Sequence, residues 1–330
     1  MIKVGLIGCG EHSENGHAVP LARYKAAHPE EIELAAACDL NLEHANAFCA
    51  RYGFSRAYSN ADAMLAQEKV DVCIAVVPVE KISTLGIQLM GMGIPCVVEK
   101  PLGASLSEIQ ALLTASKSSG TPNMVSVNRR FMPFLNRAIE WSRNAGPLRY
   151  VRATMARHAR TEPEFLWTTA VHAVDALRHI AGEVADVSLR AMQPNGSSAT
   201  WFGVDLRFEN GCLGRIDVLP TVGVLEETYE LCGEGYRATV TCPFGAQRGW
   251  QAFQENRLVI DEFALADMPE DILNGCYDEA SALLDALARG KQLWPSIEAV
   301  FPSVELCLSM ARTVEETTTK PFPIENKTRG

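Results

Sequence analysis

Short, wholly apolar segments alternate with helical patterns along the first part of the chain. The apolar segments cover residues 2–7, 32–38, 71–77, 95–98 and 123–127, with a weaker one at 56–58, and the helical patterns cover 16–27, 41–52, 60–67, 80–91 and 105–119. Strands that are apolar at every position are typical of sheets buried on both faces. The alternation therefore predicts a doubly wound parallel α/β domain over residues 1–125, with right-handed crossovers.

The pattern changes beyond this first domain. Helical patterns cover 131–144, 166–181, 272–289 and 296–318, and strand patterns cover 148–157, 184–193, 199–208, 212–219, 226–233, 236–241 and, with a break, 248–261. Asn210-Gly211 and Glu234-Gly235 are typical hairpin turns, so neighbouring strands should pair antiparallel. We expect an α+β domain over residues 126–330 with a largely antiparallel sheet, whose last helices pack back on the first domain.

Composition excludes several classes of protein. The chain has 330 residues and a formal net charge of −10, which argues against nucleic acid or an anionic membrane as the partner. Its ten cysteines form no Cys-x-x-Cys pair, and several lie inside apolar runs. The sequence shows no signal-peptide pattern and no apolar run near the roughly 18 residues of a membrane span. We expect a cytoplasmic protein with free thiols and no metal.

A glycine-rich loop follows the first predicted strand. Gly8-Cys9-Gly10-Glu11-His12-Ser13 matches the pattern G-x-G-x-x-G, except that Ser13 replaces the third glycine. In this pattern the first glycine permits a tight turn, the second lets the backbone approach a pyrophosphate, and the third position needs a small residue. The loop predicts a dinucleotide site that includes Glu11 and His12, although a turn without a ligand is the alternative. His12 and His17 are expected to be partly exposed.

Two further strand ends are candidates for cofactor contacts. Asp39 follows the second strand, where a carboxylate can accept both hydroxyls of the adenosine ribose and repel a 2′-phosphate. NAD is therefore favoured, with NADP as the alternative. Asp39 could instead be the N-cap of the following helix. Val77 and Pro78 end the third strand, where the cofactor ribose is expected to pass.

Four motifs in order give the chain a recognisable signature. They are Gly8-x-Gly10, Glu99-Lys100-Pro101, Asn128-Arg129-Arg130-Phe131 and His172-Ala173-Val174-Asp175. With them the chain resembles the Gfo/Idh/MocA oxidoreductases over nearly its whole length. The resemblance implies hydride transfer between a nicotinamide cofactor and a secondary alcohol or ketone of a sugar, cyclitol or sugar derivative. It also implies a homodimer or homotetramer formed through the second-domain sheet.

Within this resemblance, Lys100 would touch the reacting oxygen and His172 would accept or relay the proton. An ammonium group stabilises the oxyanion character that develops during hydride removal, and an imidazole titrates near neutral pH. Glu99 would lie beside Lys100, at the strand edge where ligands bind. Asn128 would hold the nicotinamide carboxamide or the substrate, or would only bridge the domains.

The sequence departs from the family pattern at Thr168, where many members carry an aspartate. A threonine can hydrogen-bond a substrate hydroxyl, but it cannot be the carboxylate partner of a lysine or histidine. The substrate candidates share a place near the second-domain helix or the strand end before it: Arg129, Arg157, Trp167, Thr168 and Asp175. For Arg157 and Trp167, a solvated loop with a packed tryptophan is an equal alternative, and Asp175 could only orient its neighbours.

Three alternatives remain open from the sequence. His172, Asp175 and His179 share one helix face and could hold a metal, but no further convergent ligand is identifiable. A redox glycosidase that uses tightly bound NAD is a second possibility, and release of free NADH would distinguish it from a dehydrogenase. The third is a non-catalytic NAD-binding sensor, which Thr168 weakly favours and the presence of Lys100 and His172 opposes.

Overall fold

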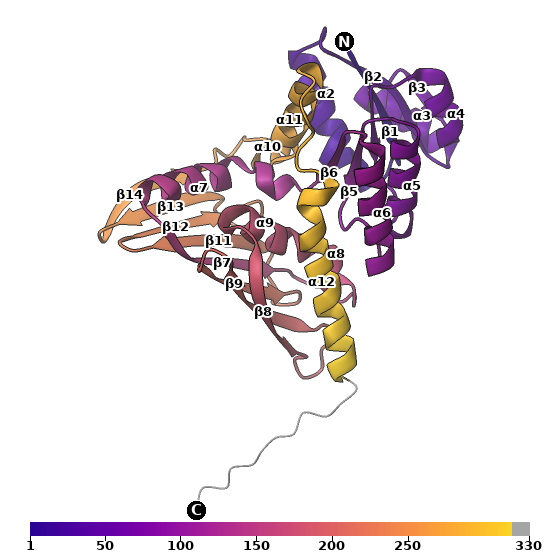
Figure 1. Cartoon of the computed structure of the whole chain (residues 1–330). Coiled ribbons are helices and arrows are strands. Elements are labelled where there is room, and N and C mark those ends of the chain that lie inside the picture. The colour runs from indigo at the N-terminus through magenta and orange to yellow at the C-terminus, as the bar shows by residue number, and fades with distance from the viewer. Residues whose placement is uncertain (319–330) are drawn as a thin grey trace, which may run out of the picture.

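The first sheet is parallel and has six strands, as the computed structural model of residues 1–318 shows (Figure 1). Its order is β3-β2-β1-β4-β5-β6, the doubly wound order in which the carboxyl ends of all strands meet at one edge. The strands are β1 (Ile2–Ile7), β2 (Ile32–Cys38), β3 (Arg56–Tyr58), β4 (Val72–Ala75), β5 (Cys96–Glu99) and β6 (Asn123–Ser126). The predicted parallel α/β fold is confirmed.

Helices connect these strands. They are α1 (Glu11–Ser13), the π-helical turn η1 (Glu14–Ala18), α2 (Val19–Ala27), α3 (Leu42–Tyr52), α4 (Ala61–Glu68), α5 (Val79–Gly91) and α6 (Leu106–Ser119). The prediction that the first helix begins at residue 16 is wrong, because helical residues begin at Glu11, directly after the glycine loop. A proline removes one helical hydrogen bond, and the π turn immediately precedes the segment that contains Pro20.

The second sheet has eight strands in the order β14-β13-β12-β11-β7-β10-β9-β8. They are β7 (Leu148–Ala156), β8 (Val184–Met192), β9 (Trp201–Phe208), β10 (Leu213–Leu219), β11 (Glu226–Gly233), β12 (Tyr236–Thr241), β13 (Gly249–Gln254) and β14 (Arg257–Phe263). The sheet is largely antiparallel, as predicted, and β7 with β10 is its parallel pair. The break predicted within 248–261 is the β13–β14 hairpin, whose turn residues Glu255 and Asn256 both have positive φ.

The remaining helical segments are η2 (Asn128–Phe131), α7 (Pro133–Ala145), α8 (Phe165–Thr168), α9 (Val171–Ala181), α10 (Glu270–Leu273), α11 (Cys276–Ala288) and α12 (Ile297–Thr318). Two single helices predicted from the sequence are each divided. The 166–181 helix is interrupted between α8 and α9, and the 272–289 helix is interrupted at Gly275, which has a φ of +85°. Within residues 1–318, no helix is both long and apolar enough to cross a membrane.

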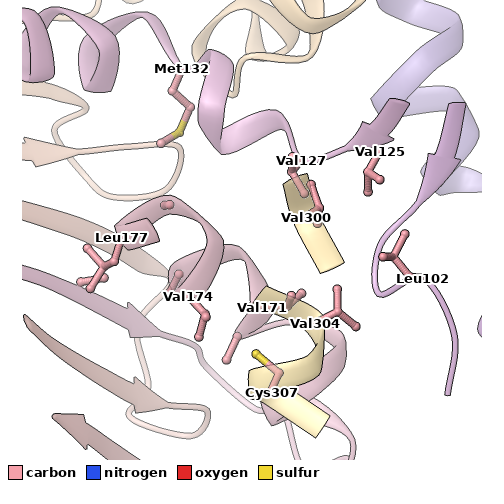
Figure 2. Close-up of a cluster of buried hydrophobic side chains, with 14 of the residues drawn as sticks. Leu102, Val125, Val127, Met132, Val171, Val174, Leu177, Val300, Val304 and Cys307 are labelled. Atoms are coloured by element: carbon pink, nitrogen blue, oxygen red, sulfur yellow. The ribbon is translucent and has the colours of Figure 1, made fainter. Parts of the chain in front are cut away.

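One hydrophobic cluster joins the two sheets through α12 (Figure 2). Helix α12 packs against both α6 and α9, while α11 packs against α2. Leu102, two residues after Lys100, belongs to the same cluster as Val171, the residue before His172, and Val304 of α12 belongs to it as well. The strand end that carries Lys100 and the helix that carries His172 are therefore anchored in one shared core.

Candidate active site

A cavity of about 940 Å³ lies at the carboxyl ends of β1, β2, β4 and β5. This edge is where ligands bind in open α/β sheets. Ten of the residues predicted from the sequence line it: Gly8, Gly10, His12, Ser13, Asp39, Val77, Pro78, Glu99, Lys100 and Thr168. Seven others do not line it: Glu11, Asn128, Arg129, Arg157, Trp167, His172 and Asp175. The cavity thus collects most of the predicted cofactor residues together with Lys100 and Thr168.

The glycine loop forms one wall of this cavity. Gly8 has a φ of +95°, and a Cβ atom there would lie 1.8 Å from the carbonyl oxygen of Val76, so no other residue fits without a shift. A Cβ atom on Gly10 would meet nothing within 4 Å. The Ser13 hydroxyl is buried without a hydrogen-bond partner among the described residues. The loop therefore leaves open space at Gly10, which suits the close approach of a pyrophosphate.

Asp39 occupies the cavity wall at the end of β2. Its Oδ2 accepts a hydrogen bond from the Cys9 backbone N–H at 3.0 Å, and its Oδ1 accepts one from Asn41 N–H at 2.9 Å. The N-cap of α3 is Asn41, whose side chain accepts from two backbone N–H groups, so the N-cap alternative for Asp39 is wrong. Each carboxylate oxygen can accept a further hydrogen bond, which leaves Asp39 able to bind two hydroxyls.

Glu99 is buried between two histidines. Its Oε1 lies 2.7 Å from His17 Nε2, and its Oε2 lies 3.1 Å from His12 Nε2. Burial would raise the pKa of Glu99, but His12 and His17 outweigh burial and hold that pKa well below its usual value. Glu99 in turn raises the pKa of His12. The expectation that His17 is partly exposed is wrong, because it is 6% exposed, whereas the side chain of His12 is 61% exposed.

Lys100 lies at the end of the cavity that Thr168 also lines. Its Nζ donates a hydrogen bond to the carbonyl oxygen of Thr168 at 2.9 Å. Burial, with smaller contributions from Arg129 and Arg160, lowers the pKa of Lys100 to about 8 against the opposing effects of Glu99 and Glu227. The depressed pKa therefore arises from the protein itself and does not need a cationic cofactor. The Lys100–Pro101 peptide bond is cis.

His172 is buried on α9, behind the cavity wall. It is 8% exposed, and its Nδ1 atom has no hydrogen-bond partner within residues 1–318. Burial, and then the positive charges of Arg129 and Lys100, lower the pKa of His172 well below its usual value. The imidazole is therefore neutral at neutral pH and has a nitrogen free to accept a proton or a hydrogen bond.

A buried ion cluster lies near these groups. The fully buried Glu227 accepts two hydrogen bonds from Arg129, both at 3.0 Å, one from Arg157 at 2.7 Å and one from the Tyr229 hydroxyl at 2.5 Å. Burial would raise the pKa of Glu227, but Arg129 and Arg157 outweigh burial and lower it to about 2. The sequence indicated both arginines as substrate candidates, but it did not identify Glu227 or Tyr229 as part of the site.

Three predicted residues have other partners in the structure. Asn128 donates to the carbonyl of Asn274 at 2.7 Å, a contact within the second domain. Asp175 accepts two hydrogen bonds from Arg130, at 2.8 and 2.7 Å, and is 1% exposed, so it is held away from the cavity. Trp167 lines a separate cavity of about 810 Å³.

Two of the three α9 residues considered as metal ligands have other partners in the structure. Asp175 is held by Arg130 and Ser303, and the His179 ring packs against Trp294 with ring centroids 5.6 Å apart. In the part of the chain that the structure describes, no group of three histidine, cysteine or acidic side chains is arranged to hold a metal ion.

The first domain is similar to a known family of proteins. Residues 2–128 match the Gfo/Idh/MocA family, described as an oxidoreductase family with an NAD-binding Rossmann fold. The chain is 27% identical over 210 residues to a D-apiose dehydrogenase from Paraburkholderia graminis, a match that covers 60% of this chain and 54% of that protein. The chain thus matches about half the length of that relative.

Solved structures share the whole fold. A Gfo/Idh/MocA family oxidoreductase from Vibrio cholerae is similar with a TM-score of 0.83 and 21% identity, covering 97% of this chain and 100% of that chain. An oxidoreductase from Agrobacterium radiobacter in complex with NAD+, L-tartaric acid and magnesium is similar with a TM-score of 0.78 and 18% identity, covering 97% and 96%. At these identities the similarity shows the fold.

Proposed function

We propose that this chain is a Gfo/Idh/MocA oxidoreductase that transfers a hydride between NAD(H) and a secondary alcohol or ketone of a sugar, cyclitol or sugar derivative, which the match of residues 2–128 to that family supports. One observation carries the proposal. Lys100 lies at one end of the cavity whose other walls are the glycine loop and Asp39, so a cofactor and a reacting oxygen can share that cavity. The neutral, partly unpartnered His172 supports it.

The cofactor would be held by the residues that line the cavity. Gly8 makes the tight turn, Gly10 leaves room for the pyrophosphate, Asp39 accepts from the adenosine ribose, and Val77 with Pro78 borders the second ribose. NAD is preferred to NADP because the Asp39 carboxylate repels a 2′-phosphate. When bound, the oxidised nicotinamide supplies the hydride acceptor.

Lys100 and His172 divide the remaining chemistry. The Lys100 ammonium hydrogen-bonds the substrate oxygen and stabilises the negative charge that develops there as the hydride leaves carbon. His172 takes the hydroxyl proton, and the reverse steps reduce a ketone. The depressed pKa of Lys100, about 8, keeps it charged at neutral pH while allowing it to exchange protons near the working range.

The decisive experiment replaces Lys100. In Lys100→Ala, kcat/KM for sugars and cyclitols should fall by about a hundredfold or more, while Kd for NAD+ changes by less than about threefold. Lys117→Ala is the matched control. Lys117 is an exposed lysine of α6 that pairs with Glu298, and its variant should behave as wild type. If the Lys100→Ala enzyme remains active, Lys100 is not the group that stabilises the reacting oxygen. Accumulation of free NADH by the wild type opposes the redox glycosidase alternative.

We also propose three further features of the protein: its domain division, its oligomeric state and its location. Residue 125 divides a cofactor-binding domain from a substrate-binding and oligomerisation domain. Helices α7 and α9 cover one face of the eight-stranded sheet (Figure 1), and the opposite face carries half-buried ion pairs such as Arg152–Asp217 and Arg215–Asp205. This open face supports a homodimer or homotetramer, which light scattering of the purified protein would test. All ten cysteines are free thiols, which supports a reducing, cytoplasmic location.

A further inference from the structure

Lys100 has no carboxylate in direct contact. The hydrogen bond of its Nζ goes to a neutral group, the carbonyl of Thr168, and none of the salt bridges of residues 1–318 includes it. The neighbouring Glu99 points its two oxygens to His12 and His17 instead. The Thr168 side chain, which lines the same end of the cavity, donates its hydroxyl to the carbonyl of Glu164 at 2.8 Å. The residue that Lys100 contacts at this end of the cavity is therefore polar and uncharged.

The buried cations around this end outnumber their partners. Arg129 and Arg157 are 6% and 4% exposed, and the two guanidinium groups share a single carboxylate, Glu227. Arg129 is also hydrogen-bonded to neutral Asn128, and Arg157 to the carbonyls of Ala156 and Glu226. The pair of arginines thus leaves an uncompensated positive charge in a region of low dielectric constant.

This charge acts on both groups assigned to the reaction. Arg129 disfavours the protonated forms of Lys100 and His172, and Arg157 does so for His172, whereas Glu99 and Glu227 favour the protonated form of Lys100. Arg160 also acts on Lys100, although it is paired with Glu162. Besides Glu99, two acidic residues line the cavity: Asp39, which follows β2, and Asp62, which lies in α4. Asp39 is three strand spacings from β5, about 14 Å, and cannot pair with Lys100.

We propose that the substrate supplies the missing negative charge: a sugar acid, whose carboxylate sits at the Lys100–Thr168 end of the cavity, rather than a neutral sugar or cyclitol. This proposal rests on the function proposed above, because it assumes that the reacting carbon also lies there. A carboxylate binds an ammonium through charge-assisted hydrogen bonds that strengthen where water is excluded. A neutral sugar would leave the excess positive charge in place.

The first test compares acids with their neutral partners on the wild-type enzyme with NAD+. D-glucuronate is paired with D-glucose, D-galacturonate with D-galactose, and D-gluconate with D-glucitol. For the best pair, kcat/KM of the acid should exceed that of its neutral partner by about tenfold or more. A neutral partner that reacts better overturns the proposal while leaving hydride transfer intact.

The second test measures binding without turnover. Isothermal calorimetry of the NADH-loaded protein should show that at least one of the three acids binds at least about tenfold more tightly than its neutral partner. Equal affinities, or no binding of any acid, overturn the proposal. If the Lys100→Ala enzyme retains full activity, the function itself fails, and that outcome is distinct from a wrong substrate class.

The third test places a carboxylate beside Lys100. Thr168→Asp should lower kcat/KM for the preferred acid by about tenfold or more relative to its neutral partner. Thr168→Asn introduces a side chain of nearly the same shape as aspartate but without its charge. It should keep the ratio of kcat/KM for the acid to kcat/KM for the neutral partner within about twofold of wild type. An unchanged ratio in a folded Thr168→Asp enzyme contradicts the proposal, and if that variant does not fold, the wild-type comparison decides.

Discussion

His17 Nε2 lies 2.7 Å from Glu99 Oε1, although 82 residues separate the two positions in the chain. Both side chains are buried, and Glu99 precedes the lysine that we assign to the reaction. The negative charge of Glu99 raises the pKa of Lys100 against the effect of burial. His17 therefore acts on Lys100 indirectly, as a positioning residue that keeps Glu99 in place and ionised.

Removing His17 should change the pH profile. In His17→Ala, Glu99 loses a hydrogen bond that favours its ionised form, so its charge weakens and the pKa of Lys100 falls below about 8. Since charged Lys100 is the active form, the alkaline limb of kcat/KM should move to lower pH by about half a unit or more. His17→Gln keeps a donor and should restore most of the limb. His28→Ala is the exposed control, and its alkaline limb should not move. If the alkaline limb of His17→Ala does not move either, the contact between His17 and Glu99 is only structural.

The two loop glycines should respond differently to the same added methyl group. Gly8→Ala forces a Cβ atom against the Val76 carbonyl at positive φ, so the free energy of unfolding should fall by more than about 2 kcal/mol. Gly10→Ala meets no atom within 4 Å, so its stability should stay near wild type. Its Kd for NAD+ should nevertheless rise about tenfold or more, because the methyl group occupies the space for the pyrophosphate. Chemical denaturation and NAD+ titration measure the two effects, and normal NAD+ binding by Gly10→Ala would place the pyrophosphate elsewhere.

Asp39 should set the choice between the two nicotinamide cofactors. Asp39→Asn removes the charge and one acceptor oxygen, so NAD+ affinity should fall about tenfold while NADP+ affinity rises or stays constant. The ratio of the two Kd values is the measurement. Asp285→Asn, on the outer side of α11, serves as the control for loss of one surface charge. A ratio unchanged in Asp39→Asn would mean that the ribose does not lie at the end of β2.

Glu279 should make stability depend on pH. Its buried carboxyl accepts hydrogen bonds from Ser126 Oγ at 2.9 Å and Val127 N–H at 2.8 Å, and burial raises its pKa to about 8. In the unfolded chain the group ionises near its ordinary pKa of about 4.3. Between these values the folded state binds the extra proton, so wild-type stability falls as pH rises through the window, by up to about 1.4 kcal/mol per pH unit.

Glu279→Gln is the variant that isolates this effect. Its amide keeps a neutral group of the same shape that can bond Ser126 and Val127, so the pH-dependent loss should disappear. Urea denaturation between about pH 5 and 8 should therefore show a wild-type minus variant difference that declines with pH. Glu298→Gln, at an exposed ion pair, should show a constant difference. A constant difference for Glu279→Gln as well would mean that this carboxyl is ionised in the folded state.

Local sequence patterns predicted the architecture because each strand is short, apolar and bounded by turn residues. Predictions failed where a distant contact decides the outcome. Asn41 rather than Asp39 caps α3, because the Asp39 carboxylate is engaged by the Cys9 backbone from another strand end. Gly275 interrupts a helical pattern because its φ is +85°. Only glycine fits there, since a Cβ atom would lie 2.3 Å from the Asn128 carbonyl oxygen.

The ion cluster shows the same limit within the site. Glu227 meets Arg129 and Arg157 across 98 and 70 residues, which no local pattern reveals. One signal was present in the sequence: Glu227 occupies an inward position of an alternating strand, in line with Tyr229 and Leu231. A carboxylate on the buried face of such a strand requires a cationic partner, and that requirement could have directed attention to the two arginines.

The shared core through α12 has a consequence for how ligands reach the site. Moving Leu102 away from Val171 would open the apolar interface that Val304 fills, and exposing that surface costs about 25 cal/mol per Å². Hinge closure between the two sheets is correspondingly opposed, so the separation of Lys100 and His172 is set before any ligand arrives. Discrimination then falls to the ligand's own dimensions and charge, and a molecule that cannot span this preset gap binds without reacting.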